Sequence, residues 1–80
     1  MEKYELYVKT IDHSPQKKPT TTERVGYVET PRIPVLGEEI CVPNDNGTRY
    51  VCKVESVEHN LIKVKESYLE SSVKVVALFG

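Results

Sequence analysis

The sequence predicts an all-β protein, a small antiparallel barrel of five or six strands that is partly open. Three observations predict it. Apolar residues recur with a period of two, short clusters of Gly, Pro and Asn separate these runs, and at most one short helical turn, near residues 66–71, fits the pattern. Two curled sheets packed as a small sandwich would satisfy the same observations. At 80 residues the chain is expected to form one domain, residues 1–80.

The first strand is predicted over residues 2–11, where apolar and polar residues alternate. Tyr4, Leu6 and Val8 form one face, which we assign to the core. Tyr7 and Ile11 then lie on the other face, either as ordinary surface residues or as part of a contact patch.

Residues 12–22, DHSPQKKPTTT, are predicted to form a mobile polar loop, because they contain nothing that could anchor a core. A connection of this length between two antiparallel strands is either functional or merely mobile. If the loop is functional, Lys17 and Lys18, together with His13, would contact an anion or a partner.

A second strand is predicted over residues 23–29. Val25 and Tyr27 alternate as core residues, which leaves Val28 on the outer face of the first two strands. Gly26 inside this strand indicates a bulge or a close approach of another backbone. Val28 therefore belongs to the same predicted contact patch as the outward residues of the first strand.

A bend is predicted after the second strand, because Pro31, Pro34 and Gly37 interrupt regular pairing. Ile33 and Leu36 are apolar residues of this bend. We expect their side chains to plug the open end of the barrel.

A β-hairpin is predicted over residues 37–59, because Asn44–Gly47 separates two apolar alternations with residues that tolerate a positive φ. A two-residue Asn46-Gly47 turn would place Ile40 opposite Lys53 and mismatch the apolar faces. A three-residue loop instead places Ile40 opposite Cys52, and every apolar residue then lies on one face. We therefore predict the three-residue loop, with its glycine in the left-handed conformation.

The hairpin register also decides whether the two cysteines can meet. In the three-residue register Cys41 points outward and Cys52 points into the core, so a disulfide would need side chains on opposite faces to converge. We predict two free thiols, with Cys52 packed as a small core residue.

The apolar alternation of the second hairpin strand loses its phase at Glu55-Ser56. One extra residue there predicts a β-bulge that returns Val57 to the core. His59-Asn60 is predicted as the next turn, which would place Val57 opposite Ile62. Residues 37–66 would then form a three-stranded twisted meander.

The stretch KESYLESS is the only one that could be helical, and a short turn there would let Tyr68 or Leu69 cover the edge of the core. The final run, VKVVALF, is apolar on both faces, which is typical of a strand inside a sheet or closing a barrel. Together these elements favour a partly open, SH3-like barrel.

Three runs of the chain resemble small β-barrel proteins of unassigned role in bacteria and their phages. They are PRIPVLGEEI, YVCKVESV and IKV, and they lie within residues 31–64. The resemblance implies no activity, but it is consistent with a structural component of a bacterial or phage assembly.

Composition and motifs exclude several classes of function. The formal net charge is −1, with both signs interspersed, so nothing pulls the chain toward nucleic acid or an anionic membrane. No apolar run could span a membrane, and the start of the chain has no secretory pattern, so we expect a cytoplasmic protein. Nucleophile-elbow, Walker and metal-ligand patterns are absent from the sequence. We therefore predict no enzyme activity, no cofactor, no metal site and no small-molecule substrate.

Two kinds of binding remain. The first is a protein-interaction or structural module that binds a protein partner or itself, with the contact formed by Tyr7, Ile11 and Val28 and bordered by Lys17 and Lys18. The alternative is single-stranded nucleic acid, which small barrels bind with aromatic and basic residues on a curved sheet. The scattered tyrosines and the acidic neighbours of most lysines favour the first.

Overall fold

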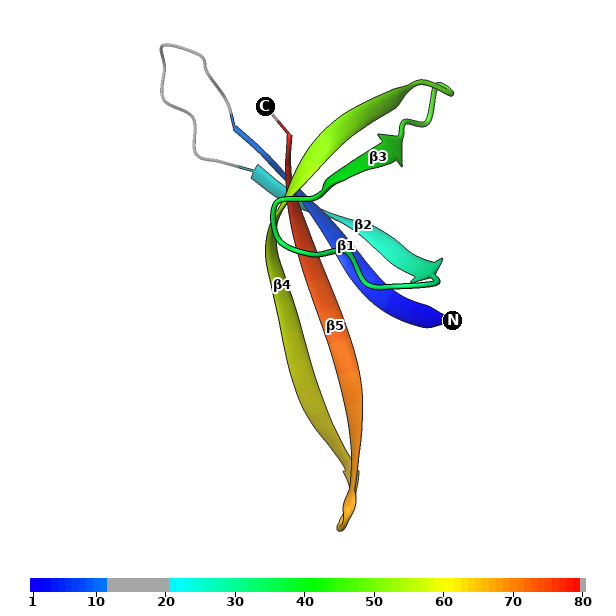
Figure 1. The fold of residues 1–80 in the computed structure, drawn as a ribbon, viewed down its shortest axis with the longest axis vertical. Helices are drawn as coiled ribbons and strands as arrows, with labels where there is room; N and C mark the ends of the chain where they lie inside the picture. The colour runs from blue at the N-terminus through cyan, green and yellow to red at the C-terminus, as the bar shows by residue number, and fades with distance from the viewer. Residues whose placement is uncertain (12–20, 80) are drawn as a thin grey trace.

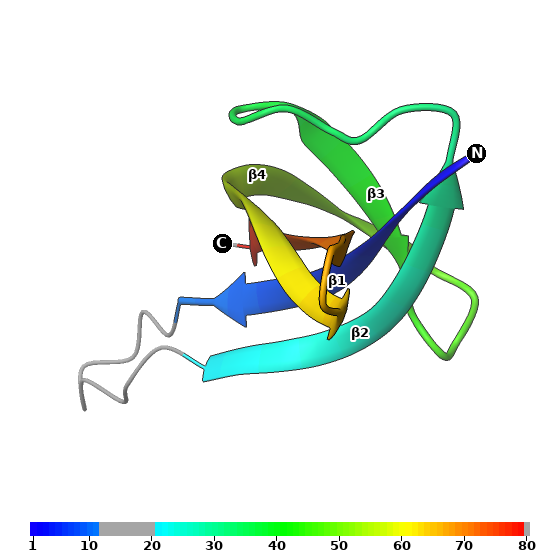
Figure 2. The same cartoon turned by 90° about the horizontal axis from the view of Figure 1, so that it is seen from below.

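The computed structural model describes residues 1–11 and 21–79, and these form one five-stranded sheet (Figure 1). The strands are β1 (Glu2–Thr10), β2 (Thr21–Thr30), β3 (Glu39–Pro43), β4 (Arg49–Lys65) and β5 (Tyr68–Phe79). Their order across the sheet is β2-β1-β5-β4-β3. The sheet curls into a half-barrel, as seen from one end in Figure 2. The all-β, partly open barrel is thus confirmed, and it is built from one sheet rather than from two packed sheets.

One strand pair differs from the predicted antiparallel arrangement. β1 and β5 run parallel, from Glu5 opposite Lys74 to Thr10 opposite Phe79, while the other three pairs are antiparallel. A parallel neighbour needs a long crossover, and here the crossover consists of β2, β3 and β4. Residue alternation records which face a strand buries but not which strand lies beside it, so the sequence contains no signal for this pair.

The hairpin of β3 and β4 has the predicted register. Ile40 pairs with Cys52 and Val42 with Tyr50. The three-residue loop is closed by two backbone hydrogen bonds, from the Asn44 N–H to the Thr48 carbonyl at 2.7 Å and from the Gly47 N–H to the Asn44 carbonyl at 3.1 Å. Gly47 has a φ of 88°, the left-handed conformation that glycine adopts most easily.

Three β-bulges, each a single unpaired residue, shift the sheet's register. They lie at Val25 in β2 and at Glu55 and Val64 in β4. The bulge at Glu55 is the predicted one, and Val57 packs against the core as expected. The one at Val64 has no counterpart in the predictions. Because one extra residue exchanges the two faces of a strand, each bulge changes which side chains point inward.

The bulge beside Gly26 corrects the predicted faces of β2. Val28 pairs with Tyr4 and packs against the core, whereas Tyr27 is 63% exposed. The predictions placed Tyr27 inside and Val28 outside, and both are wrong. Val25, which was also predicted to be a core residue, is the extra residue of the bulge and is 46% exposed, so that prediction is wrong as well.

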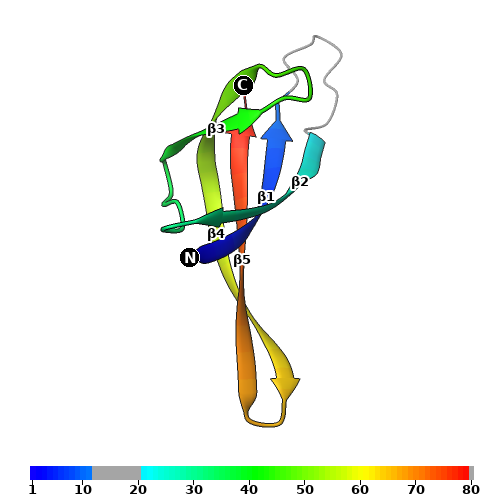
Figure 3. The ribbon, with the colours of Figure 1, turned by 90° about the vertical axis from the view of Figure 1, so that its right-hand side faces the viewer.

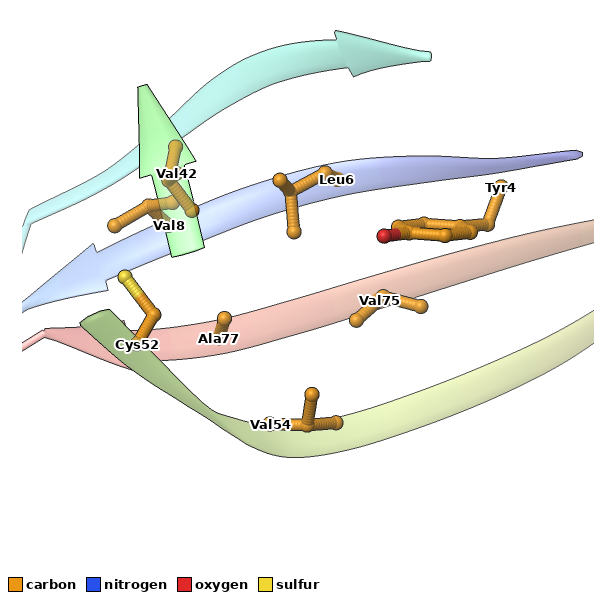
Figure 4. Close-up of a cluster of buried hydrophobic side chains, with 8 residues drawn as sticks. All are labelled: Tyr4, Leu6, Val8, Val42, Cys52, Val54, Val75 and Ala77. Atoms are coloured by element: carbon orange, nitrogen blue, oxygen red, sulfur yellow. The ribbon is translucent and has the colours of Figure 1, made fainter. Parts of the chain in front are cut away.

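The core lies on the concave face of the half-barrel. Figure 4 shows its eight buried side chains, which come from every strand except β2. They are Tyr4, Leu6, Val8, Val42, Cys52, Val54, Val75 and Ala77. As the register predicts, Cys52 is buried and Cys41 is exposed, and both thiols are free. Ile33 packs against this core, but Leu36 is 69% exposed, so only the first of the two predicted plugs is correct.

The largest difference from the predictions lies in β4 and β5. His59-Asn60 is not a turn, because β4 continues through it to Lys65 and pairs with β5 from Lys53 to Lys65. Residues 66–71 contain no helix; a two-residue turn, Glu66-Ser67, joins β4 directly to β5. Tyr68 and Leu69 are exposed and do not cover the core. The predicted meander is therefore replaced by a long hairpin, which projects from the half-barrel in Figure 3.

Candidate interaction surface

The projecting part of this hairpin, residues 58–73, is called the arm here. Its strands pair from His59 opposite Val73 to Lys65 opposite Tyr68. At about 3.3 Å per residue, this ribbon is roughly 25 Å long. Figures 1 and 3 show it leaving the half-barrel without another strand beside it.

The arm carries five exposed, large apolar side chains. They are Leu61 at 70%, Ile62 at 54%, Val64 at 48%, Tyr68 at 55% and Leu69 at 55% exposure. Single apolar residues on a surface are normal, but these are gathered on a ribbon that has no core of its own. By strand alternation Leu61 and Leu69 continue the concave face, while Ile62 lies on the convex face. Both faces of the arm are therefore partly apolar.

Both backbone edges of the arm are also unpaired among the described residues. β1 pairs with β5 only from Lys74 onward, and β3 pairs with β4 only as far as Lys53. The outer N–H and C=O groups of residues 56–65 and 68–73 thus have no strand partner in the described part of the chain. An unpaired edge with apolar side chains is a surface on which another strand can add.

A second surface, the convex face of β1 and β2, holds the predicted contact residue Tyr7. Its hydroxyl donates a hydrogen bond to the Glu5 carboxylate at 3.0 Å, and Arg24 Nε donates to the same carboxylate at 2.7 Å. The hydrogen bond from Arg24 is the main cause of a lowered pKa at Glu5, and the bond to Glu5 raises the pKa of Tyr7. The Lys74 ammonium lies 4.6 Å from the centre of the Tyr7 ring. The polar groups of this cluster already satisfy one another.

Tyr27 extends this convex surface and was assigned to the core by sequence. Lys3 Nζ lies 4.5 Å and Arg24 Cζ 5.0 Å from its ring centre. Between this ring and the root of the arm is a hollow of about 420 Å³, to which Lys3, Ile62 and Glu70 contribute. The exposed tyrosine was missed because the bulge at Val25 reversed the faces of β2.

The predicted contact residues do not form one patch. Tyr7 is half-buried on the convex face, and Ile11, one residue beyond β1, is 37% exposed. Val28 lies on the opposite face, against the core. Lys17, Lys18 and His13 fall outside the described residues, as does most of the predicted loop over residues 12–22.

Among the described residues, no three His, Cys, Asp or Glu side chains lie close enough to hold a metal ion. No helix in residues 1–11 and 21–79 has the length and apolar character needed to cross a bilayer. Burial raises the pKa of the Cys52 thiol, which disfavours the reactive thiolate.

Comparison with known proteins finds no matching family model, no similar curated protein and no similar solved structure.

Proposed function

We propose that this chain is a non-catalytic protein-interaction module that docks through its arm. The observation that carries the proposal is the coincidence, on one projecting ribbon, of five exposed apolar side chains and two backbone edges that are unpaired among the described residues. Either feature alone is common on protein surfaces. Together they provide main-chain hydrogen bonds for affinity and side-chain contacts for specificity, the two components of β-strand addition.

The energetics of the arm support this role. An isolated two-stranded hairpin is only marginally stable in water, because it buries too little apolar surface to offset the backbone entropy that is lost on folding. The arm is such a ribbon beyond the point where β1 and β3 stop pairing. A partner strand would bury Leu61, Ile62 and Leu69 and satisfy the free edge groups. The arm is therefore a better docking element than the Tyr7 face, whose polar groups are already paired.

Single-stranded nucleic acid is the second candidate, favoured by one observation. Tyr27 is exposed on a curved sheet with Lys3 and Arg24 beside its ring, an arrangement related to the stacking platforms of single-strand binders. Two features argue against it. Both cations already lie over the ring that a base would need, and Glu5 neutralises Arg24 at 2.7 Å. A binding titration against salt would reveal this function through a steep loss of affinity.

Site-specific photo-crosslinking of the full chain in its native cells tests the proposal. A photoreactive residue at Leu61 is expected to give a protein adduct of defined mass. The matched control is the same residue at Leu36, which is 69% exposed compared with 70% for Leu61 but lies on the half-barrel. If the adducts from the two positions are equally sparse, or equally heterogeneous, the arm is not a docking element.

A further inference from the structure

We propose that the partner of the arm is a second copy of this chain, paired antiparallel along the free edge of β4. This inference rests on the arm being a docking element, as proposed above, and adds the identity of the occupant. The two arms would form a four-stranded ribbon in the order β5-β4-β4-β5, with a two-fold axis near Leu61. Such a contact is isologous, so it closes at a dimer.

The β4 edge is the more accessible of the two free edges. Pairing with the β3 side ends at Val54, where the Val54 N–H donates to the Glu38 carbonyl at 2.8 Å and the Gly37 N–H donates to the Val54 carbonyl at 2.9 Å. Residues 56–65 then have no backbone partner on that side among the described residues. The β5 edge is shorter, residues 68–73, and opens onto the hollow beside Lys3 and Tyr27. A strand added there would have to fit beside the N-terminal end of β1.

The charges along the β4 edge are sorted by sign. Glu55 and Glu58 lie toward the half-barrel, and Lys63 and Lys65 lie toward the tip. An antiparallel second copy brings the basic end of one edge alongside the acidic end of the other, at both ends of the contact. A parallel copy would instead align like charges. The edge is therefore complementary to itself in the antiparallel direction only. Glu58 is the main acidic group, because Glu55 already forms an ion pair with Lys9 at 3.2 Å. By strand alternation Glu58 and Lys65 share the convex face, whereas Lys63 lies on the concave face, so Lys65 of the second copy is the expected partner of Glu58.

The centre of this edge carries two large apolar residues, Leu61 and Ile62, and lacks protection against pairing. Between Glu58 and Lys63 the residues are His59-Asn60-Leu61-Ile62, with neither a proline nor a lysine, although these are the residues that natural edge strands use to prevent addition. Leu61 and Ile62 lie on opposite faces, so a two-fold contact would cover apolar surface above and below the ribbon. The bulge at Val64 limits the pairing toward the tip. The expected contact therefore extends over about residues 58–64, centred on Leu61.

Sedimentation analysis of the pure full-length chain over a concentration series tests this proposal. A reversible dimer is expected, and it should weaken as salt screens the edge charges. Lys65→Glu should raise the dissociation constant about tenfold, because it replaces attraction to Glu58 by repulsion at two symmetric contacts. Glu58→Lys should have a similar effect, and the double variant should recover most of the affinity. Arg49→Glu, an exposed charge on the same strand outside the arm, should leave the dimer unchanged.

Three results would overturn the proposal. They are a monomer at all concentrations, a dimer that is insensitive to Lys65→Glu, and a double variant whose affinity is lower than that of either single variant. Photo-crosslinking at Leu61 distinguishes failure of the dimer proposal from failure of the proposed docking function. An adduct of twice the chain's mass supports the second copy, an adduct of another mass keeps the docking role but replaces the partner, and no specific adduct removes both.

Discussion

The two ends of the β4–β5 hairpin have similar residues and opposite environments. In the half-barrel, Val54, Val75 and Ala77 are almost completely buried, because β1 and β3 extend and curl the sheet around them. In the arm, Leu61 and Leu69 belong to the same two strands and are more than half exposed. The difference lies in their neighbours rather than in strand propensity. A hairpin can therefore be stabilised at one end by its own domain and be available at the other end for a partner.

The largest expected difference in the free energy of unfolding is between a leucine-to-alanine substitution in the core and one in the arm. Leu6→Ala should lower the free energy of unfolding by about 2–5 kcal/mol, since it leaves a cavity among buried side chains. Leu61→Ala should change it by less than about 0.5 kcal/mol in dilute solution, because its side chain is already in water. Urea denaturation at a concentration below dimer formation measures both. Comparable losses for the two variants would mean that the arm belongs to the cooperative core.

A smaller loss of stability is expected at the β2 bulge. Gly26 has a φ of 143°, a conformation that residues with a Cβ rarely adopt, although nothing lies within 4 Å of where a Cβ would be. Gly26→Ala should therefore cost about 1–3 kcal/mol through the backbone alone. Thermal unfolding followed by circular dichroism measures the loss. An unchanged midpoint would show that the bulge relaxes, and Tyr27 and Val28 would then be free to exchange faces.

The effect of pH on the core should be smaller again and confined to alkaline conditions. Burial raises the pKa of Cys52 above its ordinary value of 9.0, so the unfolded chain loses the thiol proton at a lower pH than the folded chain. The stabilising contribution of Cys52 is thus complete below that ordinary value and is lost as the pH rises through the folded-state pKa. Wild type should lose more stability than Cys52→Ala between about pH 8 and pH 10. Equal losses would indicate that Cys52 reaches solvent.

The smallest expected change in stability comes from the Glu5–Arg24 ion pair on the convex face. The hydrogen bond from Arg24 lowers the pKa of Glu5 below its ordinary value of 4.5, so the contribution of this carboxylate is present above that value and is lost as the pH falls through the folded-state pKa. Arg24→Gln should return the pKa of Glu5 toward its ordinary value, which carboxyl-carbon NMR titration can follow. Because Glu5 and Arg24 are accessible to solvent, the change in unfolding midpoint should be slight. An unshifted pKa in the variant would exclude Arg24 as its cause.

The parts of the fold that were predicted correctly are those that local chemistry determines. The three-residue loop follows from the positive φ that Gly47 accepts, and the apolar faces of β3 and β4 then allow only one register. The bulge at Glu55 follows from a break in alternation that only one extra residue repairs.

The parts that were missed depend on neighbours that a local pattern does not record. His59-Asn60 has the composition of a turn, but pairing with Val73 and Ser72 keeps it extended. The bulge at Val25 shifted two positions that alternation alone assigned to the wrong faces. The arm itself could not be predicted, because the sequence pattern around Leu61 and Leu69 would be the same if another strand covered these residues. Its exposure is a property of where β1 and β3 end.

Residue-resolved amide hydrogen exchange at two concentrations of the full chain tests the central claim most directly. Alternate amides of residues 58–64 point to the free edge of β4. They should exchange rapidly in dilute solution and slow markedly at concentrations where the dimer forms, while the core amides of β1 and β5 should be slow at both. Arm amides that exchange equally fast at both concentrations would contradict pairing between copies of the arm.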